Sequence, residues 1–541
     1  MTSRRPGAIA AIAIAMGCSS HGTGGDAPGA VSANETPAPA VDVLVHRYDL
    51  GHSGVQSKET ILGPQTVAST AFGLRATFPV DGSVYAQPLV VSNVTLGGQL
   101  RDILLVATQH DSIYAFDASG KEPAPLWQTT LLGDGETTVP TTDVGTGNIV
   151  PEIGVTGTPV VDRSRNVMYV VAKSKRPDPN DDDAYVQRLH MLDLQTGLDV
   201  VPPVEISGAV TGTAPDAENG RVAFEPLRAN QRAALVLGGG RVWIAWASHG
   251  DIDPYHGWIF AYDATDITKP PLVWATTPDG AAGGVWHAGG GVSIDDAGDV
   301  FLASGNGTFD AQTGGRNFGE AAVRLRVSGD AITVVDWFSP HDNDALSAVD
   351  SDFGTISPIL VDRGGKKLAI TGSKEGSIYV LNRDDLGGYQ ADTDRIVQRA
   401  ALGVKPLLAN PAFFDGMLYV GVAGTGVFAY AMQDDGTFDV APRSMSKTCL
   451  MCWSYGGSPV VSANGTDGAV VWALDVTGWK TNKPAVLHAW DARDLSHQLY
   501  QSDLVAKNDA PLAVKFTTPT VSGGRVYVGG VNGVALYGVS R

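Results

Sequence analysis

The residue types best suited to metal chemistry lie close together in one short stretch. The segment SHGDIDPYHG contains His249, Asp251, Asp253 and His256. Histidine nitrogens combined with carboxylate oxygens suit a transition metal ion. A loop between two strands would also contain Gly, Asp and Pro, and such a loop needs no metal. The sequence therefore predicts His249, Asp251 and His256 as metal ligands, with a purely structural loop as the alternative.

A second chemical motif is the pair Cys449 and Cys452, separated by Leu and Met. In an oxidising compartment we expect this pair to form a local disulfide. A redox-active dithiol is the alternative. A c-type haem site would need a histidine directly after Cys452, where the chain has Trp453. A zinc site made of four cysteines would need a second pair.

The composition excludes several classes of function. The chain has 38 Lys and Arg against 57 Asp and Glu, a net charge of −19, which argues against a nucleic-acid binder or a binder of acidic membranes. The 66 glycines and 31 prolines predict many tight turns between short strands. There is no Walker glycine loop, His-Glu-x-x-His motif or Gly-x-Ser-x-Gly elbow, so phosphoryl transfer, zinc proteolysis and esterase chemistry have no support.

The N-terminal segment predicts export. Arg4 and Arg5 precede an apolar run over residues 8–16, and Gly17-Cys18 follows. This order resembles the lipobox of bacterial lipoproteins, which implies cleavage before Cys18 and attachment of a lipid to it. Residues 1–17 would then be a signal peptide and residues 18–40 a flexible Pro/Gly-rich tether. Ordinary secretory cleavage and twin-arginine export are the alternatives. We therefore expect a protein held by lipid at a membrane of the bacterial cell envelope.

The elements that must position any site are repeated strands. Residues 41–541 contain eight copies of one pattern, whose third strand begins at Ser112, Gln187, Gly257, Gly319, Gly376, Gly426, Ala485 and Gly533. Short Gly/Asp links make each copy an antiparallel meander. One meander cannot bury both of its faces, whereas eight arranged radially can. The prediction is one all-β domain, an eight-bladed β-propeller, with an open β-solenoid as the alternative.

The last copy ends at its third strand, at the C-terminus. The segment LRATFPV, residues 74–80, is an additional strand ahead of the first copy. We expect it to pair with the strand near Leu536 and so complete the last blade. A blade shared by the two ends of the chain would close the ring.

The blade motif resembles that of the quinoprotein dehydrogenases, whose cofactor is pyrroloquinoline quinone (PQQ). Residues 115–117 read Ala-Phe-Asp and are followed by Gly120 and Trp127, and related motifs recur at residues 261–263 and 489–491. The chain is also similar to bacterial exported PQQ-repeat proteins, through segments such as VDGSVYAQPLVVSNV and KEGSIYVLNRD. The resemblance implies the propeller fold, and PQQ and calcium as cofactors.

One stretch resembles the active-site region of quinoprotein alcohol dehydrogenases: SGNGTFDAQTGGR followed by DWFSPHDNDALSAVDSDFG. The resemblance implies that Asn306 is a calcium ligand, that Asp350 or Asp352 is the base, and that Trp286 lies beneath the cofactor. Glu152 is a further candidate calcium ligand. Calcium prefers hard oxygen ligands, and a carboxylate can accept the proton of an alcohol while hydride moves to a quinone. Turn, loop and packing roles remain the alternative for each side chain.

The sequence leaves two candidate functions for this chain. A non-catalytic propeller that binds a ligand, a protein or a glycan is favoured because the repeats lack most docking tryptophans and the adjacent-cysteine disulfide of the dehydrogenases. A PQQ- and calcium-dependent dehydrogenase of alcohols or sugars is favoured by Asn306 with Asp350 and Asp352. Because fold does not decide function, we take the binding or scaffold propeller as the first expectation and the dehydrogenase as the alternative.

Overall fold

The computed structural model describes residues 39–177, 184–403, 406–447 and 457–540. The expected signal peptide with Cys18, and the expected disulfide of Cys449 and Cys452, lie outside these residues. No helix in the described ranges is long and apolar enough to cross a membrane.

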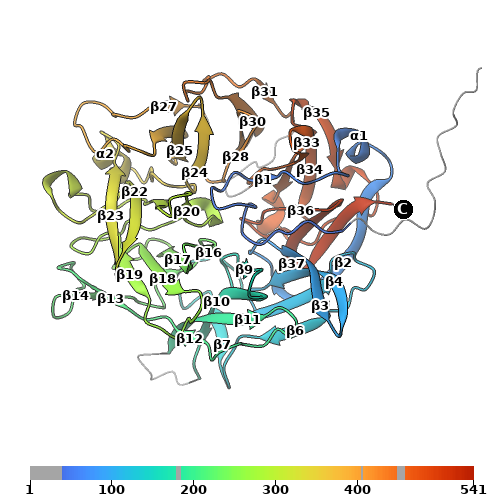
Figure 1. Ribbon diagram of the computed structural model, residues 1–541, viewed down its shortest axis with the longest axis horizontal. Helices are drawn as coiled ribbons and strands as arrows, with labels where there is room; N and C mark the ends of the chain where they lie inside the picture. Colours follow the sequence, from blue (N-terminus) through green and yellow to red (C-terminus); the bar gives the residue numbers. More distant parts are fainter. Residues whose placement is uncertain (1–38, 178–183, 404–405, 448–456, 541) are drawn as a thin grey trace, which may run out of the picture. The chain divides into compact units, whose positions relative to one another are not determined.

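The described chain is nearly all β and forms nine hydrogen-bonded sheets (Figure 1). Eight of these have three or more strands, and the ninth is the pair β13 (Ala209–Thr211) and β14 (Arg221–Ala223). The helical elements are short: α1 (Pro64–Val67), α2 (Asn343–Ala348), η1 (His287–Gly289), η2 (Ala311–Thr313), η3 (Thr477–Lys480) and η4 (Ser502–Leu504).

The first four large sheets follow one another along the chain. The first contains β3 (Leu89–Leu96), β4 (Gln99–Ala107), β5 (Ser112–Asp117) and β6 (Trp127–Thr130). The second contains β7 (Thr137–Pro140), β8 (Glu152–Ile153), β9 (Val160–Asp162), β10 (Val167–Lys175), β11 (Tyr185–Asp193) and β12 (Val204–Glu205). The third contains β15 (Ala229–Asn230), β16 (Val236–Gly238), β17 (Arg241–Ser248), β18 (Trp258–Asp263) and β19 (Leu272–Ala275). The fourth contains β20 (Ser293–Ile294), β21 (Val300–Ala303), β22 (Ala322–Ser328) and β23 (Ala331–Phe338).

The other four large sheets continue this order. The fifth contains β24 (Ile359–Arg363), β25 (Lys366–Gly372), β26 (Ser377–Asn382) and β27 (Gln398–Ala401). The sixth contains β28 (Ala412–Phe414), β29 (Met417–Val422), β30 (Gly426–Ala431) and β31 (Ser444–Met445). The seventh contains β1 (Val55–Gln56), β32 (Val460–Asn464), β33 (Asp467–Asp475), β34 (Val486–Asp491) and β35 (Asp494–Gln501). The eighth contains β2 (Phe72–Ser83), β36 (Thr520–Ser522) and β37 (Arg525–Val539).

Each segment predicted to be a third strand is a strand in the structure, from β5 to the C-terminal half of β37. The strand expected over residues 74–80 also pairs as predicted. It lies in β2, which is antiparallel to β37, with Leu74 opposite Tyr537 and Ala76 opposite Leu536.

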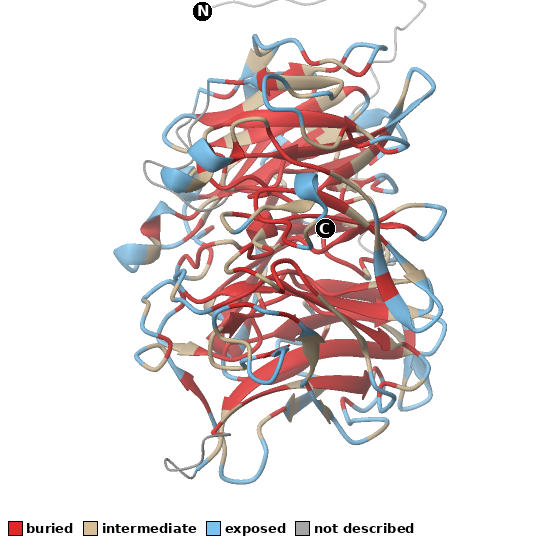
Figure 2. Cartoon of the chain, turned by 90° about the vertical axis from the view of Figure 1, so that its left-hand side faces the viewer, coloured by how far each residue is buried: buried red, intermediate tan, exposed pale blue. Residues whose placement is uncertain are grey.

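Apolar side chains bury each large sheet against the next one in chain order, and Figure 2 shows the buried strands between exposed loops. Buried pairs that share one apolar cluster are Phe116 with Met168, Tyr169 with Trp246, Trp243 with Leu302, Phe301 with Tyr379, Ile370 with Val420, and Trp472 with both Tyr419 and Tyr537. Leu536 of β37 belongs to the same cluster as Phe116 of β5. The packing therefore returns from the last sheet to the first.

A segment that the sequence analysis did not assign, residues 43–54, joins the first strands of many sheets. We call it the inner segment. Its backbone hydrogen-bonds to Val90, Val161, Ile294, Leu360, Phe413 and Val461. Its Arg47 is fully buried and donates from Nη1 to the carbonyl of Pro459 (3.1 Å) and from Nη2 to the carbonyl of Pro411. In Figure 1 several of these first strands, such as β20, β24 and β28, lie towards the middle of the view.

Candidate functional site

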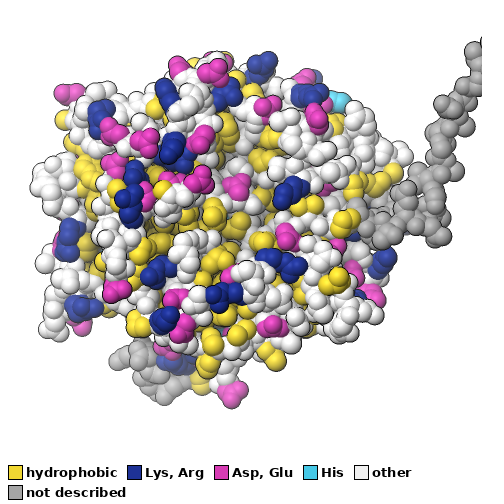
Figure 3. Space-filling model, in the orientation of Figure 1, with side chains coloured by type: hydrophobic (Ala, Val, Ile, Leu, Met, Phe, Trp, Pro, Cys, Tyr) yellow, Lys and Arg dark blue, Asp and Glu magenta, His cyan; other side chains and the backbone are white. Residues whose placement is uncertain are grey.

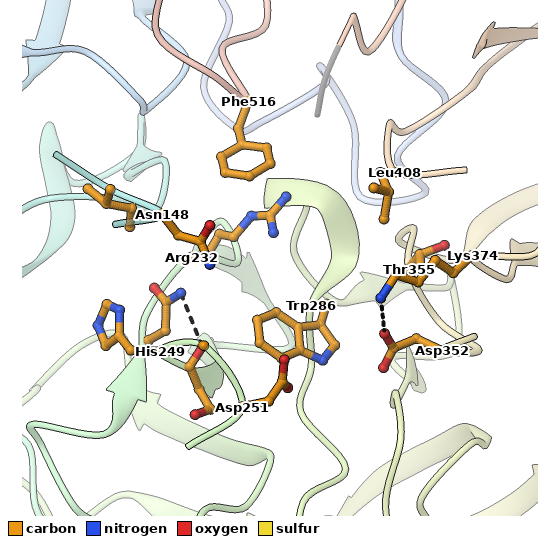
Figure 4. Close-up of a pocket in the computed structure, with 14 residues that line it drawn as sticks. Asn148, Arg232, His249, Asp251, Trp286, Asp352, Thr355, Lys374, Leu408 and Phe516 are labelled. Carbon is orange, nitrogen blue, oxygen red and sulfur yellow. Dashed lines mark hydrogen bonds and ion pairs between the residues drawn. The ribbon is translucent and has the colours of Figure 1, made fainter. Parts of the chain in front are cut away.

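One pocket lies where loops from several sheets meet (Figure 4). Its empty volume is about 860 Å³, including its opening to solvent. It is lined by Asn148, Ile149, Asn230, Arg232, Ser248, His249, Gly250, Asp251, Trp286, Asp352, Thr355, Lys374, Leu408 and Phe516. Some of these residues, such as Trp286 and Phe516, lie ahead of the first strand of a sheet. Others, such as His249 and Lys374, lie between a second and a third strand. The pocket therefore combines residues far apart in the sequence.

Four of the eighteen non-glycine residues with left-handed backbone in the described chain line this pocket or lie next to it. Asp251 (φ 54°) and Phe516 (φ 69°) line it, and His287 (φ 50°) and Ala288 (φ 48°) directly follow Trp286. Residues other than glycine adopt this conformation at a cost of about 1–3 kcal/mol, and such residues cluster at functional sites.

The structure brings together four residues that the sequence analysis proposed for a cofactor site: Trp286, Asn306, Asp350 and Asp352. The backbone N–H of Asn306 donates to Asp352 Oδ1 (2.9 Å), and its side-chain Nδ2 donates to Asp350 Oδ1 (3.0 Å). Gly305 makes this approach feasible, because an added Cβ would overlap Asp352 Oδ1 and lie 2.9 Å from Trp286 Cδ1. Trp286 and Asp352 therefore form one wall of the pocket.

Sequence reasoning missed the partner of the two aspartates. This partner is Lys374, which lies in the turn between β25 and β26. Its ammonium also lies 2.7 Å from Asp350 Oδ2 and 3.5 Å from Asp352 Oδ2. No local pattern distinguishes this turn from the others, since the ion pair depends on a loop from a different segment of the chain.

Of the two aspartates that contact Lys374, Asp352 is the buried one and lines the pocket. Burial raises its pKa to about 6, although the N–H of Asn306 and the charge of Lys374 favour the ionised form. A carboxylate with this pKa can take up or release a proton near neutral pH, as a general base must.

This raised pKa predicts a pH dependence of stability. In an unfolded chain the pKa of an aspartate is about 3.9, so between pH 4 and pH 6 the folded protein binds more protons than the unfolded one. Asp352 therefore lowers the free energy of unfolding as the pH rises through this window. Relative to the wild type, we expect Asp352→Asn to gain about 2 kcal/mol between pH 4 and pH 7, measured by urea unfolding.

The matched control for this experiment is Asp350→Asn. Its side chain is 67% exposed and touches the same lysine. We expect Asp350→Asn to change the free energy of unfolding by less than about 1 kcal/mol at each pH, because an exposed ion pair contributes little to stability. If the Asp352→Asn curve ran parallel to the wild-type curve, the burial argument for Asp352 would be wrong.

The remaining predicted ligands do not join this cluster. Glu152 accepts from Thr138 Oγ1 (2.5 Å), and its carboxylate lies 3.1 Å from His110 Nδ1. His256 contacts Asp216 (3.1 Å) and Thr277 (2.9 Å), and it lines a separate, smaller pocket.

His249 and Asp251 do line the main pocket, and each contacts a different partner. His249 Nε2 contacts Lys173 Nζ at 2.9 Å, and Asp251 accepts from the hydroxyl of Tyr255. Burial, together with the charges of Lys173 and Arg228, lowers the pKa of His249 well below its ordinary value. Within the ranges that the structure describes, no three His, Cys, Asp or Glu side chains are grouped so as to hold a metal ion.

The residues of the pocket fit a flat, anionic group such as a quinone cofactor. Trp286 offers a flat apolar face with an Nε1 that has no hydrogen-bond partner among the described residues, and Arg232 supplies positive charge in a pocket that two carboxylates, those of Asp251 and Asp352, also line. For calcium the fit is poorer. Asn306 Oδ1 has no partner in the described part of the chain, but the carboxylates of Asp350 and Asp352 are paired with Lys374. The donor set does not form a calcium cage by itself.

Neither the protein-family models nor the curated proteins contain a match to this sequence. Solved structures do match in fold. A quinohemoprotein alcohol dehydrogenase from Comamonas testosteroni is 15% identical, with a TM-score of 0.60 over 92% of this chain and 80% of that one. The quinohemoprotein alcohol dehydrogenase ADHIIG from Pseudomonas putida HK5 is 14% identical, with a TM-score of 0.57 over the same shares. BamB from Moraxella catarrhalis is 13% identical, with a TM-score of 0.48 over 86% of this chain and 99% of that one.

Proposed function

We propose that this chain, which has the β-propeller fold of the quinoprotein alcohol dehydrogenases, is an envelope propeller that binds a flat, anionic, quinone-type ligand in the pocket beside Trp286. The observation that carries the proposal is the joint wall of Trp286 and Asp352, which meet across Gly305. An aromatic face beside charged groups suits a flat ligand that bears charges.

The proposal includes eight blades in a closed ring. Two observations support it: the pairing of β2 with β37, and the apolar packing that runs from sheet to sheet and returns to the first. The inner segment adds backbone hydrogen bonds to the first strands of six sheets, which would tie the blades together at the centre.

The envelope location rests on the sequence around Cys18. Lipidation there would hold the propeller at the membrane through the residues that follow. The test is metabolic labelling with radioactive palmitate, and a Cys18→Ser variant should lose the label while the unaltered chain carries it. Labelling of both, or of neither, would overturn the lipid anchor.

A second candidate function, a dehydrogenase of alcohols or sugars, is favoured by Asp352. Its raised pKa suits a base that accepts the proton of a substrate hydroxyl inside the pocket. A bound quinone would supply the acceptor for the hydride. Lys374 would hold Asp352 in place through the ion pair.

The decisive experiment is a titration of the purified protein with PQQ, with and without calcium. We expect the bound quinone to show an altered absorption spectrum at a ratio of one per chain. Alcohols and sugars are then added with a redox dye. Binding without turnover supports the ligand-binding propeller, whereas turnover that Asp352→Asn abolishes supports the dehydrogenase. A protein that binds no PQQ under either condition contradicts both.

The surface is in keeping with a pocket-centred function. In the view of Figure 3, charged side chains of both signs are spread over the face, with hydrophobic side chains between them. The fold-level comparison names no partner for this chain, so a protein or glycan partner remains a prediction from the sequence.

A further inference from the structure

A buried lysine lies behind one wall of the pocket. Lys173 lies near the C-terminal end of β10 and is almost completely buried. Its Nζ lies 2.9 Å from the carbonyl oxygen of Leu227, 3.2 Å from that of Ala229 and 2.9 Å from His249 Nε2. Two of the three N–H groups of its ammonium are therefore used by carbonyl oxygens, and the third points at the ring of His249.

This hydrogen-bond pattern determines the proton on His249. A charged ammonium can only donate, so Nε2 of His249 must accept, and the ring proton of a neutral His249 is then on Nδ1. The neighbouring groups are equally constrained. Gln187 accepts from Trp246 Nε1 (2.8 Å), so its own amide nitrogen donates to Pro226 and Ala229 (2.9 Å each). Each hydrogen bond of Lys173 and Gln187 behind the pocket wall therefore has a defined donor and acceptor.

Two polar atoms beside His249 have no hydrogen-bond partner within the described residues. They are Oγ of Ser248 and Oδ1 of Asn230, and both side chains are buried and line the pocket with His249. Buried polar atoms are almost always paired in proteins, and an unpaired one therefore calls for an explanation. Figure 4 shows their neighbour His249 on the side of the pocket away from Lys374 and Asp352.

We propose that Asn230, Ser248 and His249 form a subsite for an uncharged group that both donates and accepts hydrogen bonds, and that Lys173 is the positioning residue that orients His249. Asn230 Oδ1 accepts, His249 Nδ1–H donates, and the Ser248 hydroxyl does either. A group with one donor and one acceptor, such as an amide, matches this set. A carboxylate does not, because it would face the lone pairs of Asn230 Oδ1. The subsite rests on the proposed ligand-binding function of the same pocket.

The first test needs no ligand. Protein labelled with ¹⁵N-histidine is examined by NMR at pH 6, and the His249→Gln variant identifies which of the 11 histidine signals belongs to His249. We expect His249 to carry its proton on Nδ1 in the wild type. In Lys173→Met the ring should shift towards the form protonated on Nε2, because the donor to Nε2 is gone. A wild-type ring protonated on Nε2, or on both nitrogens, would overturn the role of Lys173.

The second test uses two small probes of the same shape, acetamide and acetate. We expect acetamide to shift the His249 signals with an apparent affinity about fivefold above that of acetate, the value of about one hydrogen bond. Ser248→Ala removes only one hydroxyl and should reduce the preference for acetamide. This variant keeps the subsite testable if Lys173→Met does not fold. Equal responses, or none, would overturn the subsite. Binding of PQQ without an acetamide response refutes the subsite alone, whereas the reverse result refutes the quinone-type ligand alone.

Discussion

Replacing Gly54 with alanine is expected to destabilise the protein by about 3–5 kcal/mol. Gly54 lies at the end of the inner segment with φ +75°, a conformation that is unfavourable for alanine. The added Cβ would overlap Nη2 of Arg47 and lie 2.9 Å from its Cζ. Arg47 cannot move aside cheaply, because its buried guanidinium donates to the carbonyls of Pro411 and Pro459. The substitution would therefore break charge-assisted hydrogen bonds between three parts of the chain.

Gly97→Ala is the matched control for this effect. Gly97 has a similar φ of +57°, but a Cβ there would meet no atom within 4 Å. Only the backbone strain remains, and we expect a loss of about 1 kcal/mol. Both variants are compared with the wild type by urea unfolding at pH 7. Equal losses for Gly54→Ala and Gly97→Ala would show that the inner segment contributes little to stability.

The second large effect concerns the ligand. We expect Trp286→Ala to weaken the binding of PQQ by about 100-fold, because the indole supplies a flat apolar face in the pocket wall beside Asp352. The affinity is best measured by equilibrium dialysis, since the substitution also removes a fluorescent group. Trp286→Phe keeps a flat ring and should stay within about tenfold of the wild type.

Trp337→Ala provides the control for this prediction. Trp337 is a half-buried residue of β23 that packs against Phe309 with ring centroids 5.6 Å apart, and it does not line the pocket. Its replacement should leave the affinity for PQQ unchanged. A Trp286→Ala protein that binds as tightly as the wild type would place the ligand elsewhere, even if PQQ itself binds.

Much of the candidate site could be predicted from the sequence, since Trp286, Asn306 and Asp352 meet at one pocket. Their type and order along the chain were the signal. The compact segment from His249 to His256 was a weaker guide. Closeness in sequence suggested one metal site, but the two histidines point to different partners, Lys173 and Asp216. Both histidines lie in the loop between β17 and β18, but the course of this loop brings their rings to different neighbours.

The sequence alone determined the repeated strands of the eight copies and their antiparallel order, because alternation of apolar residues and glycine-rich turns are local properties of the chain. It also predicted the pairing of residues 74–80 with the strand near Leu536. Only the tertiary structure decided which loops share a pocket, that Lys374 pairs with two aspartates, and that the inner segment joins the first strands. The ion pair depends on how distant sheets pack. The inner segment is held mainly by backbone hydrogen bonds, which leave little trace in the side chains.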